Sequence, residues 1–243
     1  MRGLSLTLLA IVFTFQAAAA PYHPAGVNVT RWAKGEIEYR DTASGAVTGG
    51  EAWDLTVHPD GSRTVQASNH LGEVAHTVTL HVAKDFRPLD AYVAYWREGR
   101  FRDGALFAVR GDTLEITAAF ADRTVHETIA VPEHFSLIPH PLASDVWHGW
   151  YFDKAEGGVQ TMTVYDLDTG ARGSQAVGKL YDQKLQYLGR EDVTVPAGTF
   201  PCDHFRVDGV VDYYVTGPDA IFVKFVWTSA KATYVLTSLT RSK

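Results

Sequence analysis

The sequence predicts an all-β protein: a strongly curved antiparallel sheet, arranged as a half-barrel or sandwich of about a dozen strands with one short helix. Many short segments alternate between apolar and polar residues, which is the period of a half-buried strand. Turn residues separate these segments about every 8 to 12 residues, as in sandwiches and barrels. Helical periodicity is nearly absent from the chain.

The first half of the chain shows the strand pattern most clearly. From Val74 to Val82 every second residue shares one face, and His76 is the only polar one among them. Pro59-Asp60-Gly61-Ser62 is a turn sequence, because proline presets φ and glycine tolerates positive φ. It joins 52–57 to 63–67 as a predicted hairpin. Further strands are expected at 105–110, 113–120 and 124–131.

The last third of the chain repeats this pattern between Gly-Pro-Asp and Pro-Ala-Gly turns. In residues 221–227 both faces are largely apolar, which fits a central strand covered on each side. The strands expected here are 162–167, 176–180, 184–188, 192–195, 202–207, 210–216, 221–228 and 232–239.

One segment departs from the strand pattern. Between Pro141 and Asp153, apolar and aromatic residues recur at helical spacing. We therefore expect a single short helix or helical turn here, with Ser144 as a candidate N-cap. Two tryptophans in this segment, Trp147 and Trp150, would cover one end of a cavity or fill the core.

The N-terminus has the order of a cleaved secretory signal: Arg2, an apolar run over residues 4–15, and small residues before Pro21. Cleavage is expected after Ala19, leaving 20–243 as a single β domain. About 12 apolar residues span only ~18 Å as a helix, too short for a membrane anchor. No cysteine stands immediately after the cleavage site, so the chain is expected to be periplasmic or secreted rather than a lipoprotein.

Composition narrows the possible partners. The chain carries 22 basic and 28 acidic residues, a formal net charge of −6. This mild acidity argues against nucleic acid or an anionic membrane surface as a partner. The single cysteine, Cys202, rules out an internal disulfide, so the core alone must stabilise the fold. Stable membrane insertion is not expected, and the sequence does not indicate the oligomeric state.

One phrase in the last quarter resembles a known group. Residues 188–200 read Leu-Gly-Arg-Glu-Asp-Val-Thr-Val-Pro-Ala-Gly-Thr-Phe. This phrase and the aromatic-rich strands after it resemble DUF3108-like exported bacterial proteins of unknown function. The resemblance implies a curved antiparallel sheet around an apolar cleft, similar to lipoprotein carriers of the periplasm. It brings no catalytic residues, and Pro-Ala-Gly-Thr-Phe itself is best explained as a turn.

The candidates for chemistry lie close to the predicted helix. His140, Asp145 and His148 form the densest cluster of imidazole and carboxylate groups, but their spacing matches no zinc motif, so neither a metal nor a cofactor is expected. Asp145 stands three residues before His148, so one helical turn would let the carboxylate orient the ring for general-base catalysis. The alternative is an exposed histidine. Tyr95 is a further acid-base candidate.

Aromatic and cationic side chains supply the candidates for ligand binding. Strand alternation places Tyr95 and Arg97 on one face and Trp96 on the other. Lys224 interrupts an apolar face, where it would anchor an anion, act as a low-pKa amine, or extend to water. The candidate ligand-binding residues are Trp53, Tyr95, Trp96, Arg97, Trp147, Trp150, Tyr214, Lys224 and Trp227.

Three functional hypotheses follow. The first is a soluble periplasmic protein that binds an apolar or aromatic small molecule in a β-sheet cleft, because the chain is 12% aromatic and has no catalytic motif. The second is a cofactor-independent lyase or isomerase for an aromatic substrate, using His148, Asp145 or Tyr95. The third is a structural or chaperone-like protein of the cell envelope.

Overall fold

A computed structural model describes residues 28–167, 176–207 and 209–242. The expected signal segment lies outside the described residues. Fifteen strands join into one sheet in the order β8-β7-β6-β5-β4-β3-β2-β1-β15-β14-β13-β12-β11-β10-β9. Neighbouring strands run antiparallel, except β9 and β10, which are parallel. The prediction of an all-β fold with one curved sheet and one short helix is confirmed, with more strands than expected.

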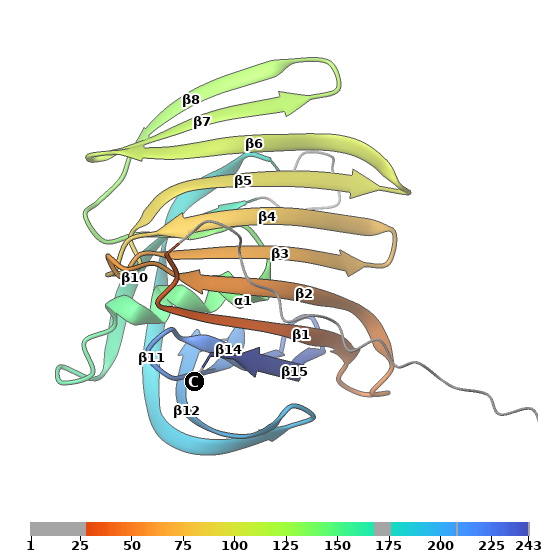
Figure 1. Ribbon diagram of the computed structural model, residues 1–243, viewed down its shortest axis with the longest axis vertical. Helices are drawn as coiled ribbons and strands as arrows, with labels where there is room; N and C mark the ends of the chain where they lie inside the picture. The colour runs from red at the N-terminus through yellow and green to blue at the C-terminus, as the bar shows by residue number, and fades with distance from the viewer. Residues whose placement is uncertain (1–27, 168–175, 208, 243) are drawn as a thin grey trace, which may run out of the picture.

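The first eight strands are consecutive hairpins that form one layer, seen at the front of Figure 1. They are β1 Arg31–Asp41, β2 Val47–Val57, β3 Arg63–Leu71, β4 Val74–Val82, β5 Pro88–Arg97, β6 Arg100–Arg110, β7 Thr113–Phe120 and β8 Thr124–Ala130. In β2, β3 and β7 buried and exposed residues alternate along most of the strand, so these strands have one inner and one outer face.

The remaining strands continue the sheet from the other side of β1 and fold behind the first layer (Figure 1). They are β9 Ser136–Ile138, β10 Val159–Leu167, β11 Gly178–Val195, β12 Gly198–Val207, β13 Val211–Thr216, β14 Ile221–Trp227 and β15 Ala232–Arg241. Phe107 of β6 packs against Tyr165 of β10, with ring centroids 6.0 Å apart. The sheet stays open, with β8 and β9 as its two edges.

A single helical segment lies between the two layers. It consists of α1, Leu142–Asp145, followed directly by a 3-10 turn, Val146–Tyr151. Ser144 is not the N-cap: Pro141 occupies that position, and the Ser144 hydroxyl donates to the Pro141 carbonyl from within the helix. No helix in the described part of the chain has the length and hydrophobicity needed to cross a bilayer.

The Pro-Ala-Gly phrase forms a hairpin turn, as expected. Val195 of β11 pairs with Gly198 of β12, leaving Pro196 and Ala197 as the two turn residues. Phe200 then packs against the core. The three strands expected at 176–195 are one strand, β11, whose register shifts between Tyr187 and Gly189. The shift explains why the local pattern looks interrupted, because a bulge changes which residues share a face.

Candidate functional site

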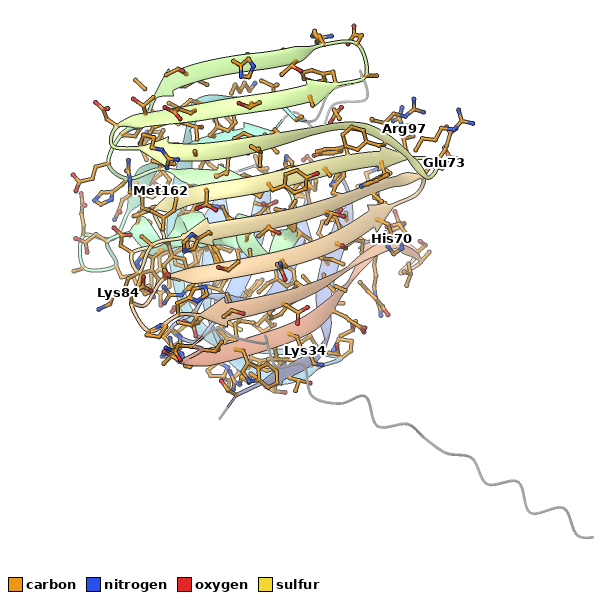
Figure 2. The ribbon with its side chains drawn as sticks, turned by 45° about the horizontal axis from the view of Figure 1, so that its top comes forward. Lys34, His70, Glu73, Lys84, Arg97 and Met162 are labelled. Atoms are coloured by element: carbon orange, nitrogen blue, oxygen red, sulfur yellow. The ribbon has the colours of Figure 1, made fainter. Side chains whose placement is uncertain are left out.

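A pocket of about 320 Å³ opens at the end of the fold where β3 turns into β4. Leu71 and Val74, on either side of that turn, lie at its margin. Figure 2 marks this end of the molecule with His70 and Glu73. Residues from both layers and from the helical segment line the pocket, so the bend of the sheet creates it. Its volume is at the lower end of the range of small-molecule sites, about 300–1,000 Å³.

One wall of the pocket is aromatic. Tyr39 packs on Tyr234 with ring centroids 4.5 Å apart, and Tyr234 stacks on Phe225 at 5.9 Å. Trp227 contacts Phe225 edge to face at 6.4 Å. The four rings come from β1, β14 and β15, which are neighbours in the sheet. Together they form a continuous apolar surface facing the pocket, which we call the aromatic wall.

A second wall is polar and is built around His140. Its Nε2 lies 3.0 Å from Asp166 Oδ1 and 2.8 Å from the Leu167 carbonyl oxygen. Its Nδ1 lies 3.5 Å from Asp145 Oδ2. We call His140, Asp145 and Asp166 the pocket cluster. Asp166 also accepts a hydrogen bond of 2.8 Å from the Tyr181 hydroxyl.

His140 carries a proton on both ring nitrogens, because each nitrogen faces only oxygen acceptors. Burial by itself would lower the pKa of His140, but the hydrogen bonds and charges of Asp145 and Asp166 outweigh it and raise the pKa to about 10. One imidazolium therefore stands between two carboxylates. Burial also raises the pKa of Asp145, although the hydrogen bond and charge of His140 lower it.

The backbone at His140 is held in an unusual conformation. His140 lies between Pro139 and Pro141 and has φ of +70°. Its N–H donates to Asp145 Oδ1 at 3.1 Å, and Asn69 Nδ2 donates to its carbonyl oxygen at 2.6 Å. A left-handed residue other than glycine is maintained only where its surroundings fix it, and such residues cluster at functional sites. These bonds hold the His140 backbone so that its ring faces Asp145 and Asp166.

His148 differs from His140 in its charge. Its Nδ1 donates to the backbone carbonyl of Asp145 at 2.5 Å, so Nε2 is left as an acceptor, 3.4 Å from Gln183 Nε2. Burial lowers the pKa of His148 to about 4. The Asp145 carboxylate, which we expected to orient this ring, contacts His140 instead. His148 is thus neutral and a weak base at neutral pH.

Glu51 lies behind the pocket and fixes its helical wall. Its carboxylate accepts from the N–H groups of Leu142 and Ala143, at 2.8 and 2.9 Å, and from the Tyr39 hydroxyl at 2.8 Å. The Glu51 side chain therefore reaches from β2 to cap the start of α1, where the first backbone N–H groups have no partner within the helix. Burial raises the pKa of Glu51 to about 7, although these hydrogen bonds lower it.

Four of the residues singled out from the sequence line this pocket: His140, Asp145, His148 and Trp227. Tyr95 does not line it and is buried, with its ring 4.0 Å from that of His76, which does. Trp53 and Trp147 are buried in the core.

The other candidates lie elsewhere. Trp96 and Arg97 are exposed near the β5–β6 turn, where Figure 2 shows Arg97 pointing away from the body. Trp150 is 44% exposed beside a separate, smaller pocket. Tyr214 and Lys224 are cross-strand partners, with the Lys224 ammonium 5.8 Å from the Tyr214 ring. Lys224 alternates with the pocket residue Phe225 along β14, which places Lys224 and its cross-strand partner Tyr214 on the opposite face of the sheet.

Sequence reasoning missed Glu51, Asp166 and Tyr39. Glu51 could have been predicted, because it alternates in step with Trp53 and Leu55 along the strand and so points to the same inner face. A carboxylate on an apolar face is rarely buried without partners. Asp166 gave no such signal, because its contact with His140 depends on β9 pairing with β10.

Within the described ranges, no group of three or more histidine, cysteine, aspartate or glutamate side chains is arranged to hold a metal ion. No protein-family model matches the chain, and no curated protein matches it in sequence. The site must therefore be interpreted from its own geometry.

Proposed function

We propose that the protein is exported and binds a small apolar or aromatic molecule in the pocket beside the aromatic wall. The observation that carries this proposal is the pocket itself: an apolar hollow of about 320 Å³ with polar groups gathered on one side. Sites for small molecules have this composition, since apolar walls supply affinity and a few polar groups fix orientation. The resemblance to DUF3108-like exported proteins is consistent with it.

Catalysis by His148 is the weaker alternative. A lyase or isomerase would need a base whose pKa lies near the working pH. His148 has a pKa of about 4, and its Nε2 already faces Gln183. The Asp145 carboxylate lies against the cation of His140, which leaves no carboxylate–imidazole pair of the expected kind. The geometry therefore supports binding over general-base catalysis.

Two measurements test binding. Native mass spectrometry of protein purified from the producing cell should show a retained small molecule. Isothermal titration with the neutral probe 2-(2-naphthyl)ethanol should show one site. Val210 lines the pocket, so the larger side chain of Val210→Trp should fill it and lower the affinity for this probe at least about tenfold.

Val47→Trp is the matched control, because Val47 is 58% exposed on β2 and does not line the pocket. It should leave affinity for the probe unchanged. Equal binding by Val210→Trp and the unmodified protein, or no binding and no retained molecule at all, would contradict the proposed function.

A further inference from the structure

We infer that the ligand carries a protonated amine at one end of its apolar or aromatic body. This inference rests on the proposed function and specifies the class of molecule that the pocket selects. It follows from the segregation of the pocket into an aromatic wall and an acceptor-rich polar wall.

The polar wall favours a cation over an anion. Among the described residues that line the pocket there is no lysine or arginine. The carboxyl groups of Asp145 and Asp166 outnumber the single imidazole of His140, so this wall offers more acceptor oxygens than cationic donors. An ammonium placed here would replace its hydration with charge-assisted hydrogen bonds, whereas a carboxylate would meet like charge.

One further group on the polar wall is suited to a donor. It is not His148, because its Nε2 lies 3.4 Å from Gln183 Nε2 and already accepts from that amide. Gln183, beside it, supplies an amide oxygen. Lys224, which the sequence offered as an anion anchor, lies on the other face of β14 and cannot serve this pocket.

Asp166 is the carboxylate best placed to receive the ammonium. Its side chain is 26% exposed, against 10% for Asp145. His140 approaches Oδ1, which is buried, and Tyr181 donates to Oδ2, so Oδ2 is the oxygen left with a lone pair for a ligand. A ligand donor reaching Asp166 would therefore add to the existing bonds without breaking them.

The aromatic wall suits the rest of such a ligand. The rings of Tyr39, Tyr234, Phe225 and Trp227 offer apolar surface for an aromatic body. Their faces also attract a cation within about 6 Å by cation–π interaction. The same four rings give an anionic head no comparable stabilisation.

The test compares three probes that share one ring system: 2-(2-naphthyl)ethylamine, 2-(2-naphthyl)ethanol and 3-(2-naphthyl)propanoate, titrated at pH 7 by calorimetry. The amine should bind about tenfold more tightly than the alcohol, and the propanoate most weakly. The alcohol reports on the proposed function alone, because it has no charge.

Two variants locate the preference. Asp166→Asn should bring the amine close to the alcohol in affinity while leaving the alcohol itself unchanged. Asp182→Asn removes the same charge from β11 but on the face opposite Tyr181 and Gln183, where Asp182 is exposed and accepts from Thr163. It should keep the full amine preference. Thermal unfolding checks that both variants are folded.

The outcomes separate the two claims. If the propanoate binds as tightly as the amine, or Asp166→Asn keeps the amine preference, the inference about the amine is wrong while binding in the pocket stands. If none of the three probes binds, both the inference and the proposed function fail.

Discussion

Two partly buried polar clusters lie near opposite ends of β1 and β3; the first links the two layers directly, and the second is linked to β3 through Asn69. At one end Asp219, in the β13–β14 turn, accepts from Arg31 and Arg63; these three residues are the arginine cluster. At the other end is the pocket cluster of His140, Asp145 and Asp166. Both bring charged groups towards the interior, but they differ in which group is in excess, guanidinium in the first and carboxyl in the second.

Arg63 is the most buried member of the arginine cluster. The Arg63 guanidinium also donates to the carbonyl oxygens of Gly61, Lys84 and Pro218 and lies 4.1 Å from the centre of the Phe86 ring. Its side chain is only 6% exposed, although Arg31 and Asp219 of the same cluster line a separate pocket of about 300 Å³. The arginine cluster sets two guanidinium groups against one carboxylate, whereas the pocket cluster sets two carboxyl groups against one imidazolium and shares its pocket with the aromatic wall. The comparison teaches that a buried charge whose hydrogen bonds are made within the protein, as at Arg63, indicates structure, whereas part-exposed acceptors beside an aromatic wall indicate recognition.

The largest effect is expected from breaking the arginine cluster. Asp219→Ala leaves the Arg63 cation buried without its carboxylate, and should lower the free energy of unfolding by about 3–5 kcal/mol. Urea denaturation measures this loss. The control is Asp122→Ala, because Asp122 has a side chain 74% exposed beside Arg123, and it should cost less than about 0.5 kcal/mol.

Affinity for 2-(2-naphthyl)ethanol should be the same in folded Asp219→Ala as in the unmodified protein, since the arginine cluster is remote from the pocket. If Asp219→Ala lowers the free energy of unfolding by less than about 1 kcal/mol, the Arg63–Asp219 pair contributes little to joining the layers.

The sequence predicted the parts of the fold that depend on local pattern. Val74–Val82 and Thr113–Phe120 have the expected bounds, because each alternates between two turn sequences. The strand β1 was missed because Gly35 stands on its inner face in place of an apolar side chain. Trp53 fills that space, and a Cβ on Gly35 would lie 2.7 Å from its ring.

The candidate site was predicted less fully, because its contacts are non-local. Asp145 and His148 were found from their spacing, but local spacing paired them with each other. The fold instead brings the proline-flanked His140 to the Asp145 carboxylate, 5 residues away, and Asp166 to His140, 26 residues away. No pattern within one segment specifies such a contact.

A smaller effect, seen only as pH changes, is expected from Glu51 behind the pocket. Its pKa is raised from 4.5 to about 7 in the folded protein, so the folded state holds a proton that the unfolded state loses. Stability should therefore fall as pH rises from about 4.5 to about 7, and the loss remains above that range.

Glu51→Gln removes this titration while keeping a neutral side chain of similar shape. Relative to the unmodified protein it should gain up to about 3 kcal/mol between pH 5 and pH 8, since one pKa unit corresponds to about 1.4 kcal/mol. Comparing urea unfolding of the two proteins at both pH values isolates this residue from the other groups that titrate. A difference that is the same at both pH values would refute a raised pKa.

The most direct test of the account is an NMR measurement on imidazole-labelled protein at pH 7.5, with and without 2-(2-naphthyl)ethylamine. Replacing His140 or His148 by glutamine assigns the two rings. The account predicts a doubly protonated His140 and a neutral His148, both shifted by the amine, while His204, which stacks on Tyr214 outside the pocket, stays unchanged. A neutral His140, or an amine that shifts neither ring, would contradict it.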